Sequence, residues 1–440
     1  MARLKEYNGH YCESEYEYAF IGFLEAEGWI YTSGNNIRRV TKRDVLIADD
    51  FKKFIADTNP ELIEEEVTQI YDNVRLVGSE SDFATLHKVY GWMVNGVQFT
   101  PQDGQPRMIP LIDFNNWDKN IFRVVNQFTV EYTNNGQKEN RRPDVLLFVN
   151  GMPLCVVELK NPADANATIY DAWEQINIRY WRDIPHLLHY CPLACISDGV
   201  KTRLGTVRTP YEHFYAWRRV NEGDVVSTLP FAETETMIKG VYTPERFVEI
   251  FRDYIYFQDS IYDSDEREIV CRYPQFFATR LLKQSIIKSV VEKSGKGGTY
   301  FGATGCGKTY TMAFLARQLA LRCTDIPEIG SPTIILIVDR DELQKQGSKL
   351  FTKSKEFLNL GEVSVVKNRA QLRQELGARQ SGGFYICTIQ KFCDREDDKI
   401  GLINDRQNII CFSDEAHRTQ LEHSKKIQFS KDADENMKAM

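Results

Sequence analysis

The stretch Gly302-Ala303-Thr304-Gly305-Cys306-Gly307-Lys308-Thr309 has the spaced glycines, the lysine and the hydroxyl residue of a phosphate-binding loop. It follows a short apolar run, Thr299–Phe301, which predicts a strand, and it precedes a helical pattern from Tyr310 to Leu321. A strand, a glycine-rich loop and a helix in this order let backbone amides and a helix N-terminus bind phosphates. The stretch therefore predicts a nucleotide site in an α/β domain.

The chain beyond this loop alternates apolar runs with helical patterns. The runs Thr333–Val338, Phe384–Thr388 and Ile409–Phe412 are short and rich in β-branched and aromatic residues. Buried strands that alternate with helices are typical of a parallel sheet covered on both faces. The fold class expected for this region is α/β.

Two acids, Asp414 and Glu415, follow the last of these strands. Thr309 and Asp414 are the expected ligands of Mg²⁺, and Glu415 is the expected base for an attacking water. Residue frequencies alone would produce the loop in on the order of one chain in fifty to a hundred, and the acids make coincidence rarer. Gln275 is a candidate contact to adenine, which would select ATP; the alternative is an ordinary surface glutamine.

A second set of charged residues lies in the N-terminal half. Asp144 begins one apolar run, while Glu158 and Lys160 end the next and, two apart on a strand, share a face. Two carboxylates and the Leu159 carbonyl could hold Mg²⁺, with Lys160 orienting water, as in metal-dependent nucleases. The alternative is a solvated charge pair on a surface hairpin. The position after Val156-Val157 favours the metal site, because a carboxylate there is costly without a partner.

The turn between these two runs decides whether the acids lie together. A two-residue turn at Asn150-Gly151 would pair Val149 with Met152 and put the acids on opposite faces. A three-residue loop with a glycine bulge would pair Phe148 with Met152 and put both acids on one face. We predict the second register.

The length of 440 residues predicts two domains, since single cores stop growing at about 250 to 300 residues. An amphipathic helix is expected from Glu13 and ends near Gly28. The acidic run 259–268 has little to bury and is predicted to be a linker. The expected domains are residues 1–258, with a nuclease core at about 10–220, and residues 269–440; residues 221–257 carry no motif.

Charge, cysteine spacing and apolar run length exclude several classes of function. The formal charge of -7 argues against binding nucleic acid over the whole surface, so any DNA path must be local, near Lys138, Arg141 and Arg142. The ten cysteines are dispersed and match no zinc spacing, which indicates reduced thiols. No apolar run approaches the roughly 20 residues that span a bilayer, and no signal peptide begins the chain. A cytoplasmic protein with no membrane role is expected.

At these residues the chain resembles the restriction (motor) subunit of type I restriction-modification enzymes over nearly all of its length. The matching segments occur in the order found in that family. They are Arg142-Pro143-Asp144-Val145, Asn150-Gly151-Met152-Pro153-Leu154, Glu158-Leu159-Lys160-Asn161-Pro162, Thr304-Gly305-Cys306-Gly307-Lys308-Thr309, Val338-Asp339-Arg340 and Asp414-Glu415-Ala416-His417-Arg418-Thr419-Gln420.

The resemblance implies a PD-(D/E)xK endonuclease domain followed by the first RecA-like lobe of a superfamily 2 translocase. It also implies ATP and Mg²⁺ as cofactors, double-stranded DNA as substrate, and methyltransferase and specificity subunits as partners. His417 joins the expected nucleotide site. Residues expected to contact the DNA strand are Arg340, Gln344, Thr388, Gln390 and Lys391.

Three departures from the family pattern stand out. The family places Gln-x3-Tyr after the nuclease strand, whereas here Gln175 is followed by Tyr180, one position later; Gln175 is kept as a site residue and Tyr180 is not. An N-terminal acid often completes the metal site in related nucleases; Glu13, Glu15 and Glu17 are available, and Glu17, next to the apolar run, is the candidate chosen. The sequence also ends soon after His417, without a second motor lobe, so weak ATP binding and negligible ATPase activity are expected from the chain alone.

Two other functions fit part of these observations. A stand-alone ATP-gated nuclease would need no methyltransferase partner. A DNA-binding translocase or scaffold module would carry the nuclease residues without cleaving DNA. Stable partner complexes would argue against the first, and loss of metal binding on Asp144→Ala would argue against the second.

Overall fold

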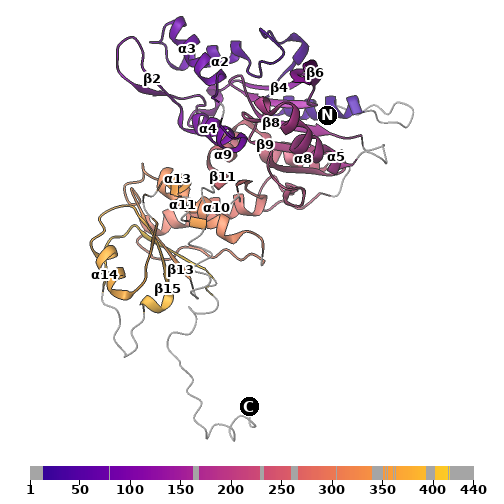
Figure 1. Cartoon of the computed structure of the whole chain (residues 1–440). Coiled ribbons are helices and arrows are strands. Elements are labelled where there is room, and N and C mark those ends of the chain that lie inside the picture. Colours follow the sequence, from indigo (N-terminus) through magenta and orange to yellow (C-terminus); the bar gives the residue numbers. More distant parts are fainter. Residues whose placement is uncertain are drawn as a thin grey trace, which may run out of the picture. The chain divides into compact units, whose positions relative to one another are not determined.

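The computed structural model divides into two compact units, Met1–Phe277 and Ala278–Met440 (Figure 1). Each unit is described by itself. The structure describes residues 13–78, 80–161, 168–227, 232–258, 266–303, 305–338, 350, 351, 353, 355–359, 361, 363–392, 402–414 and 416.

A mixed six-stranded sheet forms the centre of the first unit, in the order β1-β4-β7-β8-β9-β10. β1 is parallel to β4 and β8 is parallel to β9, while the other neighbours are antiparallel. Every residue of β7 and β8 is buried, as expected for apolar strands covered on both faces. The strands are β1 (Ile30–Ser33), β4 (Phe122–Asn126), β7 (Val145–Val149), β8 (Met152–Leu159), β9 (Leu193–Ser197) and β10 (Thr202–Thr206).

Helices pack on this sheet. α1 (Glu13–Ala26) buries Tyr16, Phe20 and Leu24 and contacts β1, β4 and β8, which confirms the predicted opening helix. It ends just before Gly28, whose φ is +100°. The following helices are α2 (Ala48–Thr58), α3 (Glu64–Arg75), α4 (Asp82–Asn95), α5 (Ile169–Glu174), the π-helical segment Gln175–Tyr180, α6 (Trp181–Asp183) and α7 (Pro185–Leu188).

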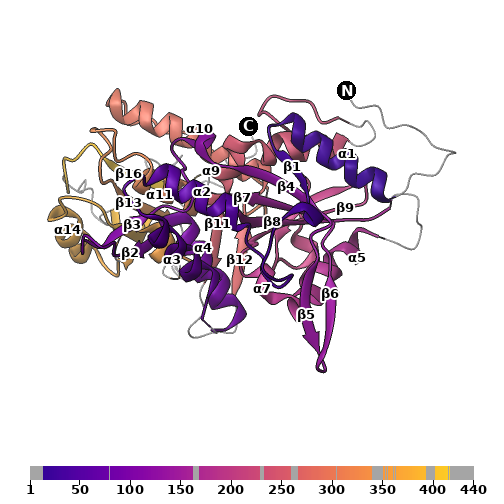
Figure 2. The same cartoon turned by 90° about the horizontal axis from the view of Figure 1, so that it is seen from above.

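Two small hairpins extend the first unit. β2 (Val97–Phe99) pairs with β3 (Arg107–Ile109), and β5 (Val130–Asn134) pairs with β6 (Gln137–Arg141). Figure 2 shows the β5–β6 hairpin as a ribbon that projects beyond the six-stranded sheet. Its second strand leads within three residues to Asp144.

The segment that carries no motif, 221–257, completes the first unit. It forms α8 (Ala232–Met237), a π-helical segment (Ile238–Tyr242), α9 (Pro244–Asp253) and β11 (Ile255–Gln258). β12 (Arg267–Val270) pairs with β11, so the chain returns to the first unit after the predicted linker. The division between units therefore falls later than predicted, within α10 (Tyr273–Val291). Residues 259–265 lie outside the described part.

The second unit contains a four-stranded parallel sheet in the order β14-β15-β13-β16. Its apolar core includes Leu319, Leu336 and Ile386, which are fully or almost fully buried. The elements are α11 (Lys308–Leu321), β13 (Thr333–Val338), α13 (Lys355–Leu358), β14 (Val363–Val365), α14 (Arg369–Gly377), β15 (Phe384–Thr388) and β16 (Ile409–Ser413). A parallel sheet with intervening helices confirms the predicted α/β class.

One predicted strand is absent. Thr299–Phe301 has no regular secondary structure, and the Phe301 side chain is 94% exposed. The run is short and lies between Gly297-Gly298 and Gly302, so it offers few ladder hydrogen bonds to offset the entropy of ordering glycine. The prediction of a strand before the phosphate loop was wrong.

The described residues bear on two predictions made from composition, one about membrane spans and one about cysteines. None of the described helices is long and apolar enough to cross a membrane. The described cysteines are free thiols, and most of them are buried, as predicted.

Candidate functional site

One edge of the six-stranded sheet brings the predicted nuclease residues together. β4, β8 and β9 end at this edge and β7 begins there, so Asn126, Asp144, Leu159 and Ser197 are neighbours across the strands. The Lys160 amide donates to the Ser197 carbonyl at 2.8 Å, which extends the pairing of β8 with β9 past Glu158. The candidate site is therefore built on buried strands rather than on loops.

The hairpin register differs from the prediction. Val149 pairs directly with Met152, across a turn in which Asn150 and Gly151 have φ of 50° and 76°. These angles define the two-residue turn that Asn-Gly favours, so the three-residue loop was wrong. The acids nevertheless share a face, because the register shifts between Leu147 and Phe148.

The position of this irregularity explains the result. After the shift, Val145 faces Val157, and continuing that register by one residue places Asp144 opposite Glu158. The extra residue lies in β8 instead of in the turn. A bulge shifts the pairing register by one residue, so every residue beyond it faces the opposite side of the sheet relative to the partner strand. Bulges often occur beside functional sites.

The two carboxylates lie close together, one partly buried and one fully buried. Asp144 Oδ2 accepts from the Leu159 amide at 2.7 Å, and Glu158 is fully buried. Burial raises the pKa of Glu158 well above its ordinary value, and the charge of Asp144 raises it further. Burial also raises the pKa of Asp144. Without a cation, the pair therefore favours holding a proton.

Lys160, Gln175, Tyr180 and Glu158 form a chain of polar contacts. Lys160 Nζ donates to Gln175 Oε1 at 2.9 Å, and Gln175 Nε2 donates to the Tyr180 hydroxyl at 2.9 Å. The Tyr180 hydroxyl donates to Glu158 Oε1 at 2.5 Å. Lys160 Nζ also lies 3.9 Å from Glu158 Oε2. Tyr180, which the sequence analysis left out of the predicted site, thus contacts Glu158 directly.

A π-helical segment explains how Tyr180 reaches the site. Residues Gln175–Tyr180 wind with one more residue per hydrogen-bonded turn than an α-helix, so side chains five apart lie on one side. The family's Gln-x3-Tyr spacing would suit an α-helix; the additional residue in this chain is absorbed by the π turn. In an α-helix, the side chains of Gln175 and Tyr180 would point in different directions. In the observed π-helical segment they lie on the same side.

Glu17 lies at the same edge, where Asn126 holds its carboxylate. Asn126 Nδ2 donates to Glu17 Oε1 at 2.5 Å, and the Tyr31 hydroxyl donates to Asn126 Oδ1 at 3.0 Å. Burial raises the pKa of Glu17, and the charge of Asp144 adds to the rise. Asn126, which was not predicted, thus holds the third acid near the pair. Its position at the end of β4 is the sequence signal that could have identified it.

The donor set fits a divalent cation. No group of three or more His, Cys, Asp or Glu side chains is arranged for a metal among the described residues. The pair Asp144 and Glu158 still offers adjacent carboxylates, and Glu158 Oε2 is buried without a hydrogen-bond donor. An orphaned buried carboxylate oxygen is costly, and a cation with oxygen preference would relieve that cost.

This geometry predicts how stability depends on pH. A carboxyl group whose pKa is higher in the folded than in the unfolded chain adds stability below the unfolded-state pKa, about 4.3 for glutamate. That contribution is lost as the pH rises through the folded-state pKa of Glu158, which is raised. When a chelator removes metal ions, the free energy of unfolding of the wild type should therefore fall as the pH rises from about 4.3 through the folded-state pKa of Glu158. The free energy of unfolding of Glu158→Gln should fall less over the same pH range.

Chemical denaturation from pH 4 to pH 8 in EDTA would measure the difference. Glu212→Gln is the matched control, because Glu212 is an exposed acid of the same unit. Mg²⁺ should restore stability at the upper end of the range, since metal binding requires ionised carboxylates. Parallel pH profiles for the wild type and Glu158→Gln would contradict the buried, raised-pKa carboxyl.

The π segment leads to a second prediction. Deletion of Ile178, a half-exposed residue of the segment, should let it wind as an α-helix and keep Gln175 and Tyr180 in contact. We expect Mn²⁺ affinity, measured by calorimetry, to stay within about threefold of the wild type. Tyr180→Phe removes a hydrogen bond to a charged group, worth about 1.5–3 kcal/mol, and should weaken binding by about tenfold or more. Metal binding that survives Tyr180→Phe but not the deletion would contradict this account.

The phosphate loop precedes α11 in the second unit. Gly305 and Gly307 have φ of 79° and 85°, values that favour glycine. A Cβ on Gly302 would lie 2.6 Å from the Cys306 Sγ, so this position also lacks room for a side chain. Lys308 Nζ donates to the Gly302 carbonyl at 3.1 Å. The lysine cation is thus held over the loop at the N-terminus of α11, where Thr309 occupies the first turn.

Some of the other predicted motor residues belong to the described part of the chain, and the rest lie outside it. Asp414 follows β16, and its amide donates to the Ile337 carbonyl at 2.9 Å; Thr388 ends β15. Both lie at the carboxyl edge of the parallel sheet, where α/β proteins bind ligands. Gln390 is exposed, whereas Lys391 Nζ donates to the Val366 carbonyl at 2.5 Å. The predicted residues outside the described part are Thr304, Arg340, Gln344, Glu415 and His417.

Gln275 is not an ordinary surface residue. Its side chain is 4% exposed, and its Oε1 accepts from the Arg272 amide at 2.8 Å, at the start of α10. An adenine contact stays a prediction.

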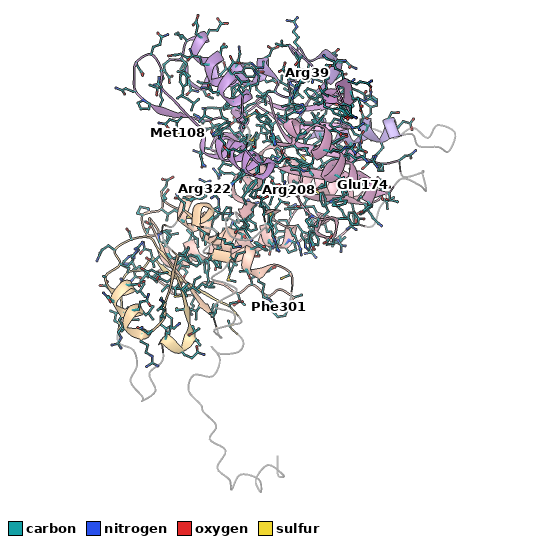
Figure 3. All side chains as sticks on the ribbon, in the orientation of Figure 1. Arg39, Met108, Glu174, Arg208, Phe301 and Arg322 are labelled. Carbon is teal, nitrogen blue, oxygen red and sulfur yellow. The ribbon has the colours of Figure 1, made fainter. Side chains whose placement is uncertain are left out.

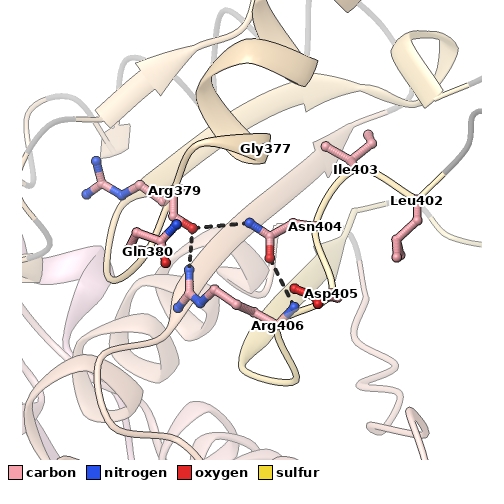
Figure 4. A pocket seen from close by; sticks show the side chains of 8 residues that line it. All are labelled: Gly377, Arg379, Gln380, Leu402, Ile403, Asn404, Asp405 and Arg406. Atoms are coloured by element: carbon pink, nitrogen blue, oxygen red, sulfur yellow. Dashed lines mark hydrogen bonds between the residues drawn. The ribbon is translucent and has the colours of Figure 1, made fainter.

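A surface pocket of about 230 Å³ in the second unit lies away from these residues (Figure 4). It is lined by Gly377, Arg379, Gln380 and residues 402–406. Arg406 donates to Thr333 Oγ1 at 2.7 Å, which places the pocket near the amino end of β13. That is the opposite edge of the sheet from Asp414, so we do not assign nucleotide binding to this pocket.

These features define a class: an α/β unit with buried acids and a lysine at a sheet edge, joined to an α/β unit with a phosphate loop. Residues 11–213 match the family model described as "Type I restriction enzyme R protein N terminus". Residues 274–440 match the model "SWI2/SNF2 ATPase".

Curated relatives agree with both matches. The chain is 30% identical to the type I restriction enzyme HindI endonuclease subunit of Haemophilus influenzae, over 95% of this chain and 40% of the relative. It is also 30% identical to the putative type I restriction enzyme MjaIXP endonuclease subunit of Methanocaldococcus jannaschii, over 92% of this chain and 39% of the relative. The chain thus spans about 40% of the length of these relatives. It belongs to the family of type I restriction enzyme endonuclease (R) subunits.

Proposed function

We propose that this chain supplies the DNA-cleaving centre and the first motor lobe of a type I restriction enzyme. The first unit would be a PD-(D/E)xK endonuclease domain, and the second would be a RecA-like lobe of superfamily 2. The observation that carries the proposal is the pair of the partly buried Asp144 and the fully buried Glu158, aligned by a bulge and adjoined by Lys160. The alternative to a metal site, a solvated charge pair on a surface hairpin, does not fit a fully buried Glu158.

Each residue of the pair has a role that its contacts support. Asp144, Glu158 and the Leu159 carbonyl would hold Mg²⁺, and Glu17 would support them through Asn126. When bound, Mg²⁺ would polarise the scissile phosphate and lower the pKa of a bound water. Lys160, held by Gln175 at 2.9 Å, would orient that water or neutralise charge that develops on the phosphate.

The second unit would bind and hydrolyse ATP. Lys308 would exchange its contact with the Gly302 carbonyl for the nucleotide phosphates, and Thr309 with Asp414 would hold a second Mg²⁺. Glu415 would activate the attacking water. Residues proposed to contact the translocated DNA strand are Arg340, Gln344, Thr388, Gln390 and Lys391.

Methyltransferase and specificity subunits are the proposed partners, because the relatives are named as endonuclease subunits of type I enzymes. Target recognition would then lie outside this chain. ATP hydrolysis would pull double-stranded DNA past the complex, and the nuclease unit would cut it.

The test is ATP-dependent cutting of unmodified circular DNA by the subunit reconstituted with these partners. We expect linear product only when ATP, Mg²⁺ and all subunits are present. Cutting without ATP or without partners would favour a stand-alone nuclease, and stable DNA translocation with no cutting would favour a translocase or scaffold.

A further inference from the structure

A short basic segment connects β1 to α2. Within residues 38–43 it carries Arg38, Arg39, Lys42 and Arg43 and no acid. Arg38, Lys42 and Arg43 are exposed, and Val40 between them is 95% exposed. The segment therefore presents three cations to solvent on a chain whose net charge is -7.

Specific contacts fix this segment beside the β5–β6 hairpin. Arg39 is labelled in Figure 3. Its guanidinium lies 3.8 Å from the centre of the Phe128 ring and donates to the Asp44 carbonyl at 3.2 Å. The Glu131 amide of β5 donates to the Lys42 carbonyl at 3.0 Å. Backbone and side-chain anchors thus hold the exposed cations at a defined place next to the hairpin base.

The same hairpin leads to the carboxylates. β6 ends at Arg141, and the exposed Arg142 precedes Asp144 by two residues. Arg142 therefore lies next to the proposed metal-binding pair along the chain, with its side chain in solvent.

Two acids near the base of the hairpin are paired with other cations. Glu131 is paired with Lys138 at 2.9 Å, and Asp183 is paired with Arg141 and Arg182, each at 2.7 Å. By contrast, Arg38, Lys42, Arg43 and Arg142 make no ion pair among the described residues; we call these four the basic face. Uncompensated arginine and lysine side chains are typical of surfaces that bind phosphate groups.

We propose that the basic face binds the phosphate backbone of double-stranded DNA and lays the duplex against the Asp144–Glu158 pair. The inference rests on the proposed nuclease function and adds the surface that holds the substrate. Arg142 would contact phosphates near the cleaved bond, and the segment 38–43 would contact phosphates farther along the duplex.

The experiment compares the wild type with the triple variant Arg38→Gln, Lys42→Gln, Arg43→Gln. The control is Lys52→Gln, Lys53→Gln, Lys88→Gln, which removes the same charge from α2 and α4 of the same unit. Binding of a fluorescent 30-base-pair duplex is measured in EDTA by anisotropy, over a range of salt concentrations. Thermal unfolding checks that both variants are folded.

Each phosphate contact contributes about 0.9 to the slope of log K against log salt concentration. We expect the basic-face variant to bind about tenfold or more weakly at 0.1 M salt, with the slope reduced by up to about 2.7. The control should match the wild type. Equal slopes and affinities for the two triple variants would overturn the proposal.

Separate measurements test the DNA-binding role of the basic face and the nuclease proposal, so one can be wrong while the other stands. Duplex binding in EDTA involves no metal, so the difference between the two triple variants tests the basic face independently of the nuclease centre. Mn²⁺ binding that is unchanged by Asp144→Ala would count against the nuclease centre and would leave the result for the basic face standing.

Discussion

Replacement of Asp144 by alanine is expected to lower the rate of DNA cleavage by the reconstituted enzyme about a thousandfold or more. The carboxylate lies opposite Glu158 and is fixed by the Leu159 amide at 2.7 Å, so its loss removes one side of the proposed metal site. Metal ions stabilise the transition state by several kcal/mol, and each 1.36 kcal/mol changes the rate about tenfold. Single-turnover cutting of circular DNA measures the effect.

Two observations separate a chemical role for Asp144 from a structural one. The Asp144→Ala protein should still hydrolyse ATP in the complex, because the phosphate loop belongs to the other compact unit. Glu212→Ala, which removes an exposed acid of the same unit, should cut at the wild-type rate. Cutting that survives Asp144→Ala within about tenfold would show that the active site lies elsewhere.

Replacement of Lys308 by alanine is expected to weaken ATP binding by about ten- to a hundredfold and to abolish ATP-dependent cutting. Hydrogen bonds to charged groups contribute about 1.5–3 kcal/mol, and Lys308 Nζ is already held over the loop by the Gly302 carbonyl at 3.1 Å. A fluorescent ATP analogue measures the affinity.

The control for this variant is Lys288→Ala, which removes an exposed lysine of the same unit. It should bind nucleotide as the wild type does. Lys308→Ala should keep the Mn²⁺ affinity of the nuclease centre. Wild-type ATP affinity in Lys308→Ala would contradict the assignment of residues 302–309 as the phosphate loop.

The nuclease edge shows what the residues alone could predict. The spacing of Glu158 and Lys160 on an apolar strand predicts that these two share a face, whereas the place of Asp144 beside them depends on the register of the hairpin. The register was wrong because pattern alone does not place a bulge: a shift within β8 and a loop at Gly151 align the acids equally well.

Tyr180 was missed for a related reason. Its side chain is five residues from Gln175, and counting along an α-helix separates the two. Only the observed π winding reveals that the hydroxyl reaches Glu158. The additional residue between the glutamine and the tyrosine was the available signal, because single insertions in helices are commonly absorbed as π turns near functional sites.

In the second unit, sequence patterns located three strands and the helix after the loop. They failed for Thr299–Phe301, where β-branched and aromatic residues suggested a strand but flanking glycines leave the run irregular. The acidic run 259–268 also does not reveal that β12 pairs back to β11, which places β12 in the first unit.

The most direct test of the central claim is calorimetric titration of Mn²⁺ into this chain without nucleotide, comparing the wild type with Glu158→Gln at pH 7.5. Glutamine can still accept the Tyr180 hydrogen bond, so the change removes charge with little change in shape. The account predicts saturable binding to the wild type and none to the variant. Equal binding by both proteins would contradict a metal centre at Asp144 and Glu158.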